Sequence, residues 1–186
     1  LNPSINYGVL PNSIALSSAL AQPKDVVWDA AGKTMFVAAF GTDRIGIVDP
    51  TGKVTGFIEV GNTAGTKVDS RNKRGPRGLA LHSSGVLYVL NRLSNSISAI
   101  DTSTKKVLWE LGLFDPTPSK TKQGRGFLYD AKLSGNATFS CGSCHVDRDT
   151  DGLAWYLGDP GGDTFVTRAG PTELPLHPMR DRKHAA

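Results

Sequence analysis

The sequence is poor in cysteine and has no long apolar run. Its 186 residues include only two cysteines, too few for a disulfide framework to stabilise a domain of this size. No apolar stretch approaches the roughly 20 residues of a transmembrane helix, and residues 1–22 lack the basic start and apolar core of a signal peptide. If the protein is exported, we therefore expect this chain to be already mature or to be a piece of a longer one.

The sequence also lacks the mixture of basic and stacking aromatic residues that a nucleic-acid groove uses. Its net charge of +4 and pI near 9.1 mildly favour acidic partners, but we expect no nucleic acid among them. Glycine (21) and proline (11) are instead plentiful, which indicates many turns and short strands.

Two stretches, residues 23–61 and 76–112, repeat one pattern of four short strands separated by polar turns. A period of roughly 40 residues with four strands is typical of a propeller blade. After an opening strand in each repeat, we expect strands at Met35–Ala39, Ile45–Asp49 and Val54–Val60, and at Val86–Leu90, Ile97–Asp101 and Val107–Leu111.

The repeats resemble the YVTN family of β-propeller repeats, whose pattern is Val-x-Asn, a Ser-Asn turn and Ile-Asp-Thr. The second repeat matches this pattern well, whereas the first has Ala39 where the family prefers Asn; the matching residues are Asn91, Ser94, Asn95, Ile100, Asp101 and Thr102. Two blades form an incomplete propeller with open edges, so we expect other blades from the rest of the chain or from another subunit. Packing roles are expected inside the blades for Trp28, Phe36, Tyr88 and Trp109, and a turn role for His82.

Both cysteines lie in one motif, Cys141-Gly-Ser-Cys144-His145. Cys-x-x-Cys-His is the attachment motif of haem c, in which both thiols bond to the haem vinyl groups and the histidine ligates the iron. A thioredoxin-like pair would need a βαβ context, and a zinc site would need two further ligands of suitable spacing. A simple disulfide would leave His145 unexplained. The motif therefore favours one covalent haem.

Residues 122–165 resemble the N-terminal helix, loop and haem motif of the di-haem cytochrome c peroxidase and MauG family. The matching residues before the motif are Gly124, Arg125, Phe127, Leu133, Ser134 and Gly135, with a helix expected at Gly124–Asp130. The fold class expected is mainly β, with two four-stranded blades of an incomplete propeller followed by a small α/loop cytochrome c-like segment. The domains would be an N-terminal extension (1–22), the blades (23–113) and the haem segment (114–186).

Several further ligands are candidates. Met179 and His177, in "LHPM", are alternative sixth ligands of the iron, and Met would give the higher reduction potential. Asp147, Asp149 and Asp151 match the start of a calcium loop, although position twelve is Gly158 rather than the required glutamate. Solvated turn carboxylates are the favoured alternative. An aromatic electron relay in this family makes Trp155 a weak candidate for that role.

The loop between the repeats carries many basic residues, which we interpret first as a solvated insertion. The alternative is a basic patch that docks an acidic partner or meets the haem propionates. The residues concerned are Lys67, Arg71, Lys73, Arg74 and Arg77.

Three functions follow from these resemblances. The first is one-electron transfer by a c-type haem protein with an unidentified redox partner. The second is a peroxidase or oxidase of the di-haem type, whose second haem would lie on a missing part of the chain or on a partner, because this sequence has one Cys-x-x-Cys-His only. The third is a propeller binding module with an ancillary haem. Covalent attachment implies a bacterial periplasmic or cell-surface location.

Overall fold

The computed structural model describes residues 17–61, 67–134, 137–145, 165–169 and 172–176. The chain divides into two compact units, Leu1–Asp147 and Arg148–Ala186. In the second unit, β9 (Phe165–Ala169) pairs antiparallel with β10 (Thr172–Leu176). Among the described residues, no helix is long and apolar enough to cross a membrane.

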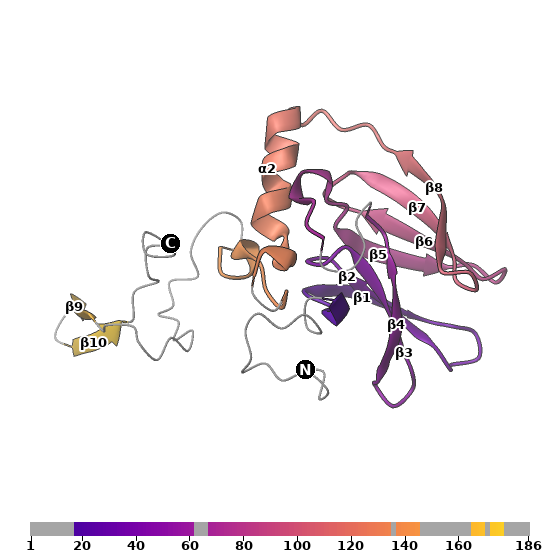
Figure 1. Cartoon of the computed structure of the whole chain (residues 1–186), viewed down its shortest axis with the longest axis horizontal. Coiled ribbons are helices and arrows are strands. Elements are labelled where there is room, and N and C mark those ends of the chain that lie inside the picture. Colours follow the sequence, from indigo (N-terminus) through magenta and orange to yellow (C-terminus); the bar gives the residue numbers. More distant parts are fainter. Residues whose placement is uncertain (1–16, 62–66, 135–136, 146–164, 170–171, 177–186) are drawn as a thin grey trace. The chain divides into compact units, whose positions relative to one another are not determined.

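The first unit contains two four-stranded antiparallel sheets, each in sequence order (Figure 1). The first holds β1 (Pro23–Trp28), β2 (Met35–Ala39), β3 (Arg44–Val48) and β4 (Val54–Glu59). The second holds β5 (Pro76–Leu81), β6 (Val86–Asn91), β7 (Ser96–Asp101) and β8 (Lys106–Gly112). The fold class is therefore confirmed: the unit is mainly β and consists of two propeller-like blades with one short helix.

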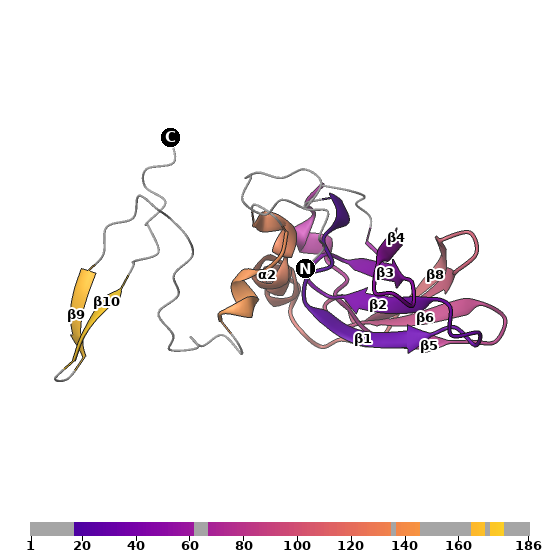
Figure 2. The same ribbon diagram turned by 90° about the horizontal axis from the view of Figure 1, so that it is seen from below.

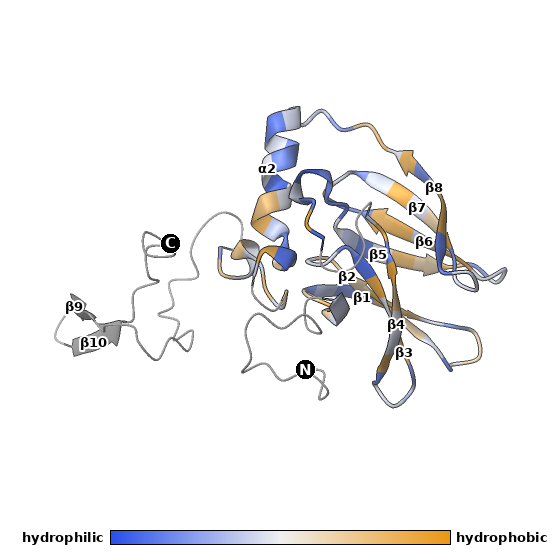
Figure 3. Ribbon diagram, in the orientation of Figure 1, coloured by the Kyte–Doolittle hydropathy of each residue, from blue (hydrophilic) through white to orange (hydrophobic). Residues whose placement is uncertain are grey.

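The hydrophobic core lies between the two sheets. β1 packs beside β5 (Figures 1 and 2). The core side chains come from strands of both blades: Ile45, Ile58, Leu87, Val89 and Ile100, each at most 2% exposed. Figure 3 shows how apolar residues follow the strands. Burial of this shared core is what holds one blade against the other.

The expected packing role is confirmed for Phe36 but not for three other aromatic residues. Trp28, Tyr88 and Trp109 are 46%, 38% and 47% exposed. In β6, burial alternates along the strand, so Tyr88 lies on the face opposite to the buried Leu87 and Val89. There its ring centroid lies 6.1 Å from that of Trp109, on the wholly exposed β8.

His82 is a turn residue, as expected. Its backbone closes the β5–β6 turn, accepting from Gly85 N at 3.0 Å and donating to Val86 O at 2.9 Å. Gly85, at φ +85°, supplies the left-handed conformation that this turn requires.

The helix was expected at Gly124–Asp130, but α2 spans Ser119–Tyr129. It begins directly after Pro118, whose carbonyl accepts from Lys122 N at 3.0 Å. The first turns are polar and the last is apolar (Figure 3), so the apolar pattern alone marked only the second half. The described part of this unit also contains three 3₁₀ turns, η1 (Ser70–Asn72), η2 (Ala131–Leu133) and η3 (Cys141–Ser143).

Candidate haem-binding site

The Cys-x-x-Cys-His motif lies on a helical turn. η3 starts at Cys141, whose carbonyl accepts from Cys144 N at 3.3 Å and from His145 N at 2.9 Å. Residues three and four positions apart lie on the same face of such a turn, which groups the two thiols and the imidazole. Cys141 is exposed, Cys144 is half-buried, and neither is in a disulfide. This arrangement fits the donor set that a covalent haem needs.

Hydrogen bonds fix this turn to the first blade. Ser140 and Ser143 form a capping box, in which each side chain accepts from the other residue's backbone N–H. Gln22 Nε2 donates to Ser140 Oγ at 2.8 Å and to Ser143 Oγ at 2.6 Å. Because Gln22 directly precedes β1, the motif sits at the point where the first strand begins.

Gly142, between the two cysteines, packs against the ring of Tyr129. A Cβ added to Gly142 would lie 2.6 Å from Tyr129 Cδ1, closer than a carbon contact allows, so glycine lets the turn approach α2. The Tyr129 ring in turn meets Phe40 edge-on, with ring centroids 5.3 Å apart. The motif is thus seated on α2 as well as on β1.

A buried ion network includes Asp130 and Lys132, in the stretch that leads from the end of α2 to the cysteines and is called the motif segment below. This network corrects the interpretation of the inter-blade loop. The side chain of Lys73, expected in a solvated loop, is only 2% exposed. Its Nζ lies 3.1 Å from Asp130 Oδ1 and 3.6 Å from Asp43 Oδ1. Asp130 also accepts from Ser70 Oγ at 2.7 Å, which joins the loop to the segment before η2. A buried lysine requires such partners, and they come from distant parts of the chain.

A second buried group continues the network into β3 and β4. Arg44 Nε lies 2.8 Å from Glu59 Oε1, and Arg44 Nη1 donates to Ala19 O at 3.1 Å. Lys132 Nζ lies 3.7 Å from Glu59 Oε2. Burial lowers the pKa of Lys132, and the Glu59 carboxylate opposes this effect only in part. Three acidic and three basic side chains of this network therefore connect the blade, the loop and the motif segment.

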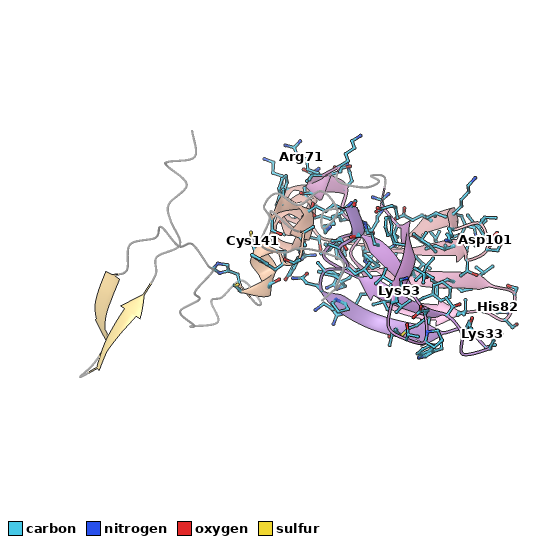
Figure 4. All side chains as sticks on the ribbon, turned by 60° about the horizontal axis from the view of Figure 1, so that its bottom comes forward. Lys33, Lys53, Arg71, His82, Asp101 and Cys141 are labelled. Atoms are coloured by element: carbon cyan, nitrogen blue, oxygen red, sulfur yellow. The ribbon has the colours of Figure 1, made fainter. Side chains whose placement is uncertain are left out.

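The remaining basic residues of the loop divide into two groups. Arg74 is partly buried and its Nε lies 3.0 Å from Glu110 Oε1 on β8. Lys67, Arg71 and Arg77 are exposed; Arg71 is labelled near α2 in Figure 4. The basic-patch interpretation therefore applies to these three residues only.

The other candidate ligands lie outside the described residues, and the structure leaves them as predictions. These are Met179, His177, Asp147, Asp149, Asp151 and the proposed relay Trp155. Within the described ranges, no three or more His, Cys, Asp or Glu side chains gather in a way that could hold a metal ion.

Comparison with known protein families assigns the part of the chain that contains the blades. The family model described as "Lactonase, 7-bladed beta-propeller" matches residues 18–152, more than half of the sequence. The chain belongs to this family. The matched range of this lactonase-type propeller includes both blades and extends past His145. No curated protein matches the chain.

Solved structures show partial likeness. Hydrazine synthase from Kuenenia stuttgartiensis is 26% identical, with a TM-score of 0.43, over 53% of this chain and 25% of that one. Catalytically inactive virginiamycin B lyase from Staphylococcus aureus is 20% identical, with a TM-score of 0.42, over 56% and 30%. Apo AztD from Citrobacter koseri is 21% identical, with a TM-score of 0.37, over 50% and 24%. The chain thus spans less than a third of the length of each of these proteins. A similarity this partial does not indicate a shared function.

Proposed function

We propose that this chain, with its two propeller blades, is a c-type haem protein that transfers single electrons. Cys141 and Cys144 would hold the haem covalently, and His145 would ligate its iron. The observation that supports this proposal is the η3 turn, which brings the three side chains to one face and leaves Cys141 exposed. The haem, when bound, supplies a one-electron couple at its iron.

The rest of the chain would act as a rigid support for this site. Gln22 and Ser140 hold the turn against β1, Gly142 allows it to approach Tyr129, and Lys73 ties the preceding segment to the inter-blade loop through Asp130. A fixed support keeps the distance to an electron donor or acceptor constant, which suits transfer without bond rearrangement. We include in the proposal an unidentified redox partner and a periplasmic or cell-surface location.

The open side of the second blade is proposed to meet further blades. Leu108 and Leu111 on β8 are 54% and 56% exposed, and Phe114, just beyond the strand, is 90% exposed. An apolar surface of this kind marks an interface, and the family to which the chain belongs has seven blades. The occupant would be the next blade, from the same chain or from another subunit.

The experiment is an absorption spectrum of the protein made in a host that matures c-type cytochromes. A six-coordinate spectrum that does not change with peroxide or cyanide would support electron transfer, and the weak long-wavelength ferric band of Met–iron ligation would assign Met179 over His177. A high-spin spectrum that shifts with these ligands would favour the peroxidase alternative. Absence of any haem band would overturn the proposal. The variant Cys141→Ala with Cys144→Ala is the matched control and should be colourless.

A further inference from the structure

A cavity lies between the two blades, at the end of the sheets away from the Cys-x-x-Cys-His motif. It has a volume of about 610 Å³ and is lined by the β1–β2, β5–β6 and β7–β8 turns. Figure 4 places Lys33, His82 and Asp101 at this end and Cys141 far from it. The cavity is therefore separate from the proposed haem site, and a ligand could bind in it whether or not the motif holds a haem.

Part of the cavity lining is apolar. Phe36 and Ile47 come from the first blade and Leu81 from the second, so both blades contribute to this apolar part. Trp28 lines the cavity at the end of β1 and is 46% exposed, which leaves part of its indole ring open to a ligand. Pockets of this volume, with apolar walls and a few polar groups, are characteristic of small-molecule sites.

One cation, Lys105, belongs to the described lining. Lys105, in the β7–β8 turn of the second blade, has φ +57°, and a Cβ built on Gly56 would lie 3.5 Å from its Nζ. The ammonium group of this second-blade residue therefore lies beside β4 of the first blade. Among the described residues, Lys105 forms no ion pair. The positive charge is left for a ligand.

His82, also in the lining, favours a ligand that accepts hydrogen bonds. Ser84 N donates to His82 Nδ1 at 3.2 Å, and Ser84 Oγ lies 2.8 Å from the same nitrogen, so Nδ1 is engaged within its own turn and Nε2 is the ring nitrogen left for a ligand. Asp29, the one acidic side chain among the described lining residues, already accepts from Lys33 N at 2.7 Å as part of its own turn. These bonds hold Asp29 in its own turn without removing its charge, so Lys105 and His82 are the groups of the lining that would attract an anion.

We propose that this cavity binds a small planar organic anion of the aromatic carboxylate class. Its ring would lie against Trp28 and Phe36, and its carboxylate would accept from Lys105 and His82. The combination uses three features of the lining: the apolar side chains from both blades, the partly exposed indole and the ammonium group of Lys105. A neutral molecule of the same shape would leave the ammonium group without a partner.

The test uses 2-naphthoate as the probe and 2-naphthamide as its neutral match, titrated into the isotopically labelled chain and followed by amide NMR. We expect 2-naphthoate to shift the amides of turns 82–85 and 102–105, and Lys105→Gln to weaken it by about fivefold, as for a partly exposed charge pair. Lys53→Gln, at the same end in the β3–β4 turn, should leave the affinity unchanged.

Three results would overturn the proposal: no shifts at millimolar probe, equal affinity for the naphthamide, or shifts centred on β8 and Phe114. Equal weakening by Lys105→Gln and Lys53→Gln would also overturn it, because it would indicate a general effect of charge. Trp28→Ala, at a half-exposed position where folding is little affected, should weaken both probes. Unchanged binding in this variant would contradict the placement of the ring.

Discussion

Replacing Lys73 by methionine tests the buried network that joins the motif segment to the blades. The lysine side chain is 2% exposed, and its two acidic partners, Asp130 and Asp43, are 2% and 8% exposed. Methionine keeps most of the apolar stem but removes the charge, so both carboxylates lose their buried cation. The variant should therefore be less stable than the parent chain.

The size of the loss in unfolding free energy depends on the hydrogen bonds that the two carboxylates keep without Lys73. Breaking a buried ion pair costs about 3–5 kcal/mol. Asp43 keeps hydrogen bonds from Arg74 N at 3.0 Å and Gly75 N at 2.7 Å, and Asp130 keeps those from Ser70 Oγ and Lys132 N. We therefore expect the lower end of the range, about 3 kcal/mol. With a urea dependence of about 2 kcal/mol per molar, the unfolding midpoint should fall by roughly 1.5 M.

The assay is urea unfolding followed by tryptophan fluorescence, with Lys122→Met as the matched control. Lys122 makes an ion pair of similar length, 3.0 Å to Asp115 Oδ2, but its side chain is 35% exposed. Pairs of this kind contribute less than about 1 kcal/mol, so the control midpoint should fall by under roughly 0.5 M. Equal shifts in the two variants would refute the assignment of Lys73 to a buried network.

The remaining predictions concern glycines and one acidic turn. Gly126→Ala should destabilise the chain by more than about 1 kcal/mol, because the added Cβ would overlap Ser70 O. Gly124 lies on the same helix with nothing near its Cβ position, so Gly124→Ala should be neutral or stabilise the chain by up to about 1 kcal/mol. Thermal unfolding compares the two variants. Gly142→Ala should speed proteolysis within residues 137–145, because the added Cβ would push the turn away from Tyr129 of α2. An unchanged cleavage rate would contradict the packing of the turn on α2. Hydrogen bonds from Ser103 lower the pKa of Asp101 to about 2. The stability that this carboxylate adds is therefore present above pH 3.8 and lost as the pH falls through 2. In urea titrations at several pH values, Asp101→Asn should reduce the loss of stability at acid pH.

The blades could be predicted from the sequence because their information is local. The repeated spacing of apolar residues and turns located the second, third and fourth strand of each blade to within a residue, and Met35–Ala39 agrees at both ends. The turn role of His82 followed from its place before Gly85. What the pattern could not show was which face of a strand the neighbouring blade covers, and so Tyr88 and Trp109 were assigned to the interior.

The support of the motif could not be predicted, because it depends on contacts between distant residues. Lys73 and Asp130 are 57 positions apart, and Gln22 and Ser140 are 118 apart. In the sequence Lys73 is one of several basic residues in a polar loop, and nothing local distinguishes it from the exposed Arg71. Gly142 carries a weaker signal: its position between the cysteines is visible, but the facing Tyr129 ring is not.

The central claim is that Cys141 and Cys144 hold a haem covalently, and the mass of the denatured protein tests it most directly. Protein from a maturation-competent host, unfolded in acid and measured intact, should be heavier than its sequence by one haem. The variant Cys141→Ala with Cys144→Ala should have the sequence mass alone. A wild-type mass equal to that of the bare chain, with two thiols open to alkylation, would contradict the claim.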